Sequence, residues 1–109
     1  MELIKNLEKE TVLVLKDRLD YEEGQVVSVS LAQRPGVGIS LMAFDEGEAI
    51  GTHAAPGDAF VTVLDGTGEY TIGGTPHTVK AGESIVMPVN IPHSVKALTK
   101  MKMLLVLVK

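Results

Sequence analysis

Glycine and proline interrupt the chain at short intervals between residues 24 and 92, and this punctuation limits what the chain can fold into. The breaks include Pro35-Gly36, Asp65-Gly66 and Gly73-Gly74. Asp-Gly and Gly-Gly pairs favour two-residue hairpins, because both turn positions tolerate a positive φ. A long helix has no room after residue 24. We therefore predict an all-β chain, with tight hairpins at residues 65–66 and 73–74.

Short segments between the breaks carry the β-branched and apolar residues typical of strands. In the first segment Val27, Val29 and Leu31 alternate with Ser28 and Ser30, which predicts a half-buried strand. The other expected strands cover residues 37–44, 49–54, 60–64, 69–72, 78–80, 84–87, 94–97 and 101–108. Many short strands at about 8–12-residue spacing predict a sandwich or barrel, and 109 residues suit one domain.

The first residues have a mixed pattern. Leu3, Ile4 and Leu7 have helical spacing, whereas residues 11–15 are β-branched and apolar enough for a strand. We expect residues 1–24 to form an arm, as a short helix or an edge strand, that packs on a barrel formed by residues 25–109.

Two expected strands, 60–64 and 103–108, are apolar on both faces. One interpretation is that both lie between packed sheets of the same barrel, with 101–108 as a central strand. The other is that their outer faces are covered by a second subunit. We predict a homodimer, because closed two-fold dimers are the commonest oligomers.

Composition narrows the class of partner. The net charge of −4 argues against nucleic acid, which needs clustered Lys and Arg. The longest apolar run, 103–108, is far shorter than the roughly 20 residues that span a membrane. The chain has no cysteine and no signal-peptide pattern at its start, which fits a cytoplasmic location. A small-molecule or protein partner is therefore favoured.

Residues 47–66 have the spacing of a known motif. Gly47 is followed after five residues by His53, one residue separates His53 from Ala55, Ala59 follows after three more, and Gly66 after six. This resembles the first cupin motif, Gly-x5-His-x-His-x3–4-Glu-x6-Gly. Alanine stands at the positions of the second histidine and of the glutamate.

A second motif follows at the distance typical of compact microbial cupins. Gly82 is followed after five residues by Pro88, Asn90 comes two positions later, His93 after two more residues, and Ala97 after three. This resembles the second cupin motif, Gly-x5-Pro-x-Gly-x2-His-x3-Asn. Asn90 replaces a glycine, and asparagine also tolerates positive φ. The resemblance implies a double-stranded β-helix, or jelly-roll, barrel.

In cupins the three motif histidines and the glutamate hold a divalent metal. The resemblance transfers only His53 and His93 to this chain, because alanines 55 and 59 cannot donate to a metal. Catalytic zinc needs about three protein ligands, and non-heme iron needs two histidines and a carboxylate. We expect weak or partial capacity for Fe, Mn, Ni or Zn through this pair, or else a metal-free, hydrogen-bonded pair.

Two other residues are candidates to complete the set. Asp58 is next to the lost glutamate position, but strand alternation aims it at the other face, and its simpler role is to brace the Pro-Gly-Asp turn. His77 follows the Gly73-Gly74 turn and is the better candidate for a third imidazole. Its simpler interpretation is a surface histidine on a hairpin.

The two alanines also widen and line the mouth of the barrel. We expect a pocket lined by His53, Ala55, Ala59, Val61, Met87 and His93 that holds a small, partly apolar molecule. The alternative is a metal-dependent enzyme of the dioxygenase, isomerase or decarboxylase type that uses His53, His93 and His77. Metal-free acid–base work by the imidazoles is a further possibility. The sequence gives no catalytic residue and no substrate.

Overall fold

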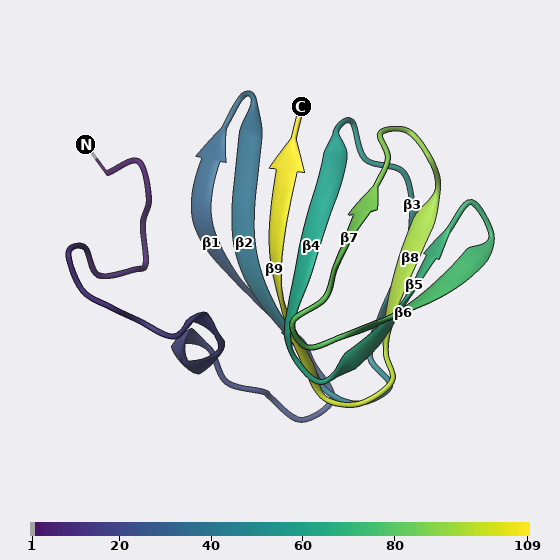
Figure 1. Cartoon of the computed structure of the whole chain (residues 1–109), viewed down its shortest axis with the longest axis horizontal. Coiled ribbons are helices and arrows are strands. Elements are labelled where there is room, and N and C mark those ends of the chain that lie inside the picture. Colours follow the sequence, from purple (N-terminus) through teal and green to yellow (C-terminus); the bar gives the residue numbers. More distant parts are fainter. Residues whose placement is uncertain (1) are drawn as a thin grey trace.

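The computed structural model describes residues 2–109, and these residues form two antiparallel β-sheets that face each other (Figure 1). The elements are η1 (Leu15–Arg18), β1 (Val26–Arg34), β2 (Val37–Phe44), β3 (Ala49–His53), β4 (Asp58–Asp65), β5 (Thr67–Ile72), β6 (Thr75–Lys80), β7 (Ser84–Met87), β8 (His93–Ala97) and β9 (Met101–Val108). Strand order is β1-β2-β9-β4-β7 in the five-stranded sheet and β3-β8-β5-β6 in the four-stranded sheet. The predicted all-β barrel is confirmed.

The main core lies between the two sheets. Tyr70 and Val95 from the four-stranded sheet pack with Phe44, Val63 and Met103 from the five-stranded sheet, and all five are at most 3% exposed. Strand β9 is the middle strand of its sheet, as its apolar sequence predicts. Its inner face supplies this core, and its outer face supplies a second apolar surface.

One of the two predicted hairpins is confirmed and the other is wrong. Strands β5 and β6 pair through Ile72↔Thr75, and Gly73 and Gly74 both have positive φ. By contrast, β4 and β5 belong to different sheets, so Asp65-Gly66 is a crossing between sheets. At Gly66 the chain passes against the backbone of Lys100, which a side chain would prevent. Asn90 has φ 61°, as its glycine-like position predicts.

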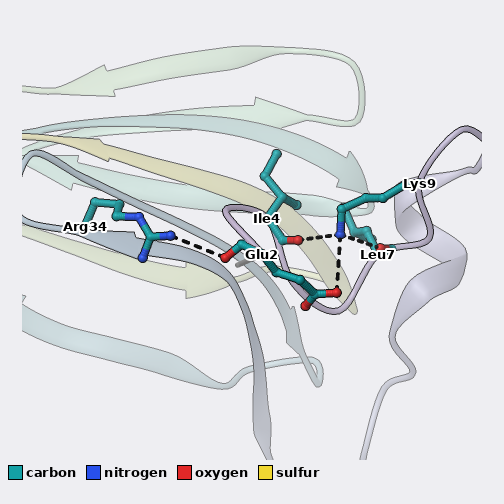
Figure 2. A network of polar contacts seen from close by, with 5 residues as sticks. All are labelled: Glu2, Ile4, Leu7, Lys9 and Arg34. Carbon is teal, nitrogen blue, oxygen red and sulfur yellow. Dashed lines mark hydrogen bonds and ion pairs between the residues drawn. The ribbon is translucent and has the colours of Figure 1, made fainter.

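Residues 2–25 form an arm beside the five-stranded sheet, with η1 as their helical element (Figure 1). The helix lies at Leu15–Arg18, so the arm has neither helix at residues 3–7 nor strand at 11–15. Figure 2 shows one anchor: Arg34 Nη2 donates to Glu2 O at 3.3 Å, and Lys9 Nζ lies 3.8 Å from Glu2 Oε1. Among the residues described, no helix is long and apolar enough to cross a membrane.

The arm covers part of the outer face of the five-stranded sheet. Leu19 packs there with Leu31, Leu41 and Ala43 in a second apolar cluster, separate from the core between the sheets. Tyr21 extends this contact: its hydroxyl donates to Asp65 Oδ2 at 2.7 Å, and burial is the main cause that raises its pKa. The arm is thus tied to the outer face, away from the space between the sheets.

Candidate functional site

A cavity of about 120 Å³ lies between the two sheets. It is lined by Met42, Ile50, His53, Ala55, Ala59, Met87, His93, Val95, Met103, Leu105 and Leu107. The lining is apolar except for the two histidines. This combination of an apolar wall and a few polar groups is typical of small-molecule pockets.

The two histidines come from neighbouring strands. His53 ends β3 and His93 begins β8, and the register pairs the two residues directly. Their ring centroids are 4.4 Å apart, with the planes at 70°. His93 is 3% exposed, whereas His53 is exposed. The fold therefore brings together His53 and His93, the two histidines that match the motif positions.

Backbone contacts fix the tautomer of both rings. Nδ1 of His53 is 3.0 Å from Gly51 O, and Nδ1 of His93 is 3.2 Å from Ile91 O. A carbonyl oxygen only accepts, so each Nδ1 must carry the hydrogen. In the neutral ring Nε2 then keeps its lone pair. Each neutral histidine therefore has Nε2 as its remaining hydrogen-bond acceptor.

The environment of His93 keeps its ring neutral. Burial lowers the pKa of His93 below its ordinary value of 6.5, and the neighbouring His53 lowers it further. The hydrogen bond to Ile91 acts in the opposite direction. At neutral pH the ring therefore accepts hydrogen bonds through Nε2 and carries no charge.

Five of the six residues predicted to line the pocket do so, namely His53, Ala55, Ala59, Met87 and His93. Val61 does not. It shares the inner face of β4 with Ala59, but it lies two residues, about 7 Å, further along the strand. There it is fully buried in the core. The prediction for Val61 is corrected: it lies in the core next to the pocket, where it pairs with the lining residue Leu105.

His77 does not reach the histidine pair. It lies on β6, at one edge of the four-stranded sheet, and His53 lies on β3 at the opposite edge. Three strand spacings separate the two edges, about 14 Å. The prediction of His77 as a third imidazole is therefore corrected: it is exposed and opposite Tyr70. Asp58 lies outside the lining, and its Oδ1 accepts a hydrogen bond from Val89 N at 2.8 Å.

The residues at the pocket do not fit a resident divalent metal. The two imidazoles are its only side chains that suit a divalent metal such as Zn²⁺ or Fe²⁺, since the other lining residues are alanines, larger aliphatic residues and methionines, whose thioethers suit softer ions such as Cu(I). Within residues 2–109 no group of three or more His, Cys, Asp or Glu is placed to hold an ion. Catalytic sites ordinarily supply about three protein ligands.

Sequence reasoning missed six of the nine apolar lining residues. Met42 comes from β2, Met103, Leu105 and Leu107 come from β9, and Ile50 and Val95 come from the four-stranded sheet. The alternation of β9 gives a signal for its three residues, because positions 103, 105 and 107 share one face. Which face turns inward became clear only from the pairing of β9 with β2 and β4.

Two facing antiparallel sheets with a histidine-bearing cavity between them define a small jelly-roll barrel. The chain belongs to the cupin family, whose model, described as a cupin domain, matches residues 40–109. No curated protein matches the chain.

Solved structures agree with this assignment. A conserved protein of unknown function from Streptococcus pyogenes is 43% identical with a TM-score of 0.97, covering 100% of this chain and 96% of that one. A cupin superfamily protein from Desulfitobacterium hafniense is 28% identical with a TM-score of 0.92 and 96% coverage of both chains. A salicylate 1,2-dioxygenase variant from Pseudoaminobacter salicylatoxidans is 17% identical with a TM-score of 0.70, covering 75% of this chain and 26% of that chain. At that identity the likeness concerns the fold alone.

Proposed function

We propose that this cupin binds a small, partly apolar molecule between its sheets, with His53 and His93 as the polar anchors. The observation that carries the proposal is the pair of rings, 4.4 Å apart, on an otherwise apolar cavity. Both Nε2 atoms are acceptors, so the ligand should present a hydroxyl or another neutral donor. Its donor should face the histidines and its apolar part the wall of methionine, valine and leucine.

The cavity volume limits the part of the ligand that enters. Benzene occupies an engineered apolar cavity of about 150 Å³, and this cavity is about 120 Å³. A branched or straight chain of about four carbons therefore fits better than a larger ring system. Affinity for such a fragment should be on the order of millimolar, since few atoms make contact.

Metal capacity is the weaker part of the proposal. Two imidazoles would give Fe²⁺, Mn²⁺, Ni²⁺ or Zn²⁺ only weak affinity, because the remaining positions would be left to water. The alternative function, a metal-dependent enzyme of the dioxygenase, isomerase or decarboxylase type, has less support. It requires a third protein ligand that neither His77 nor Asp58 supplies.

Titration with 1-butanol, followed by amide chemical shifts in ¹⁵N-labelled protein, tests the proposal. We expect millimolar binding at pH 7.5, with shifts centred on β3, β4 and β8. The double change His53→Ala and His93→Ala should weaken binding about 10-fold or more, because both acceptors are lost. His77→Ala, a histidine change outside the cavity, should leave binding unchanged.

The same titration, repeated at several pH values, should show that the affinity for butanol falls as the pH is lowered. Binding through the neutral His93 ring should be constant at and above neutral pH and should decline in acid, since protonation removes the Nε2 lone pair. The lowered pKa of His93 shifts its decline to below 6.5. Butanol binding that survives the loss of both histidines would reject their role as anchors. Chemical conversion of the alcohol in the sample would favour the enzyme.

We further propose that the chain is a homodimer that buries the outer faces of β4 and β7. Phe60 and Val86 pair across these strands and are 44% and 49% exposed, and Val108 at the end of β9 is 55% exposed. Sedimentation at micromolar concentration should give twice the chain mass of 11.6 kDa. Phe60→Lys should give monomer, whereas Val12→Lys in the arm should not. Monomer in the unchanged protein would contradict this.

A further inference from the structure

A second hollow of about 280 Å³ lies beside the histidine pocket. It is lined by Ser28, Ser30, Gln33, Gly38, Ile39, Ser40, Leu105 and Leu107. Leu105 and Leu107 also line the histidine pocket, so the two spaces meet along β9. The smaller space is apolar with two imidazoles, and the larger one has a serine-rich wall.

Strand pairing places these serines on the inner face of the five-stranded sheet. Ser28 pairs with Met42, and Ser40 pairs with Leu105, so all four side chains share the face that bounds the histidine pocket. Ser30 pairs with Ser40 on the same face. Strands β1 and β2 lie on the side of β9 away from β4 and β7 (Figure 1). Ser28 is exposed there and Ser30 and Ser40 are partly exposed, so the four-stranded sheet does not cover this part of the inner face.

The orientation of β1 is the reverse of what a simple sandwich requires. Val27 and Val29 pack in the outer apolar cluster beneath the arm, and Ser28 and Ser30, which alternate with them, turn inward. An inner sheet face is ordinarily apolar. The arm therefore allows β1 to direct hydroxyl groups toward the interior side, next to the pocket.

The chemistry of this wall favours a neutral polar group. Within the part of the chain described, the hydroxyls of Ser28, Ser30 and Ser40 make no hydrogen bond to protein, and Gln33 extends over Gly38, whose ideal Cβ position is 3.4 Å from Gln33 Oε1. Hydroxyls and an amide both donate and accept. No charged side chain lines the hollow, so an ionic group would find no partner there.

We infer that the serine-lined hollow binds the uncharged, polyhydroxylated end of a ligand whose other end, a short apolar chain tipped by a hydroxyl, occupies the histidine pocket. This inference rests on the proposed function. The shared leucines give the apolar chain a continuous path, and the hydroxyls of the ligand lie over the three serines and Gln33. The ligand class is thus an amphiphile such as a short-chain glycoside.

Two probes that share a four-carbon chain with a terminal hydroxyl test this inference: 1-butanol and 4-hydroxybutyl β-D-glucoside. Amide shifts from butanol should be confined to the histidine pocket, whereas the glucoside should also move the amides of Ser30 and Ser40. The glucoside should bind about 10-fold more tightly, the effect of one or two added hydrogen bonds. Equal affinity for the two probes would overturn the inference.

Variants separate the hollow from the pocket. Ser30→Ala with Ser40→Ala should reduce glucoside affinity to that of butanol and leave butanol affinity unchanged. Ser84→Ala, on β7 and outside both cavities, should change neither. Undiminished glucoside binding in the double variant would overturn the inference while the proposed function stands. Glucoside shifts at β1 and β2 without butanol binding would reject the proposed function and keep the hollow as a sugar site. Binding of neither probe would reject both.

Discussion

Replacing Ala55 by His and Ala59 by Glu is expected to convert the pocket into a divalent-metal site. Both alanines line the same cavity as His53 and His93. In the cupin pattern these positions belong to a histidine and a glutamate. The double variant would therefore supply three imidazoles and one carboxylate to one space of about 120 Å³. That donor set suits Zn²⁺, Ni²⁺ or Fe²⁺.

Metal binding by the double variant can be measured as an increase in the free energy of unfolding. A metal that binds only the folded chain stabilises it by about 2.7 kcal/mol at one hundred times its dissociation constant. For a domain of this size that corresponds to a rise in Tm of roughly 10 °C or more. The unchanged protein, with two imidazoles, should show a much smaller rise under the same conditions. Thermal unfolding with and without Ni²⁺ or Zn²⁺, together with metal content after gel filtration, gives both values.

Matched variants assign the effect to the four side chains. Ala55→His with Ala59→Gln keeps the shape of the glutamate but removes its charge, so metal affinity should fall. Adding His93→Ala to the double variant should abolish the rise in Tm. If the double variant takes up no more metal than the unchanged chain, the four positions do not converge on one point, and the alignment of this pocket with the cupin metal site is wrong.

Positions that need a positive φ were predictable from sequence, because the backbone conformation of a turn depends mainly on the residues of the turn itself. Asn90 and Gly73-Gly74 occupy positions that require positive φ, and each adopts it. Motif spacing also placed His53 and His93 in one pocket. The pairing of β3 with β8 brings the two motifs together. The motif spacings are typical of a family in which these two strands pair, so matching the spacings was enough to predict that the histidines meet.

Contacts between distant segments were not predictable in this way. Asp65-Gly66 has the composition of a hairpin, yet Gly66 is needed for close approach to residues 99–100, more than thirty positions later. His77 was expected near the rim of the barrel, but strand order places its strand at the far edge of the sheet.

The serines of β1 show a second limit of sequence patterns. Alternation identifies two faces of a strand but not which one turns inward. A valine face is expected to meet the main core. Here the arm supplies Leu19 and its neighbours as a separate apolar surface, and Val27 and Val29 pack there instead. Only the arm makes this orientation favourable, and its course had no clear signal in the sequence.

Gly66→Ala is expected to be the most destabilising of the glycine-to-alanine changes in the turns. Gly66 has φ +76°, and a Cβ atom there would lie 1.8 Å from Lys100 O and 2.8 Å from Thr99 Oγ1. The left-handed conformation costs about 1–2 kcal/mol for an alanine, and forcing atoms into a packed site adds about 1–3 kcal/mol. The loss of about 2–5 kcal/mol is a large part of the 5–15 kcal/mol typical of a domain.

Two other glycines separate these contributions in urea unfolding followed by circular dichroism. Gly82 has φ +88° but open space around it, so Gly82→Ala should cost only the conformational part, about 1–2 kcal/mol. Gly36 has open space and no positive φ, so its replacement by Ala should be within about 1 kcal/mol of neutral. If Gly66→Ala costs no more than Gly82→Ala, the crossing at Gly66 has room for a side chain. The glycine that ends the first motif would then be required for its φ alone, and the contact between the two turns would be loose enough to yield.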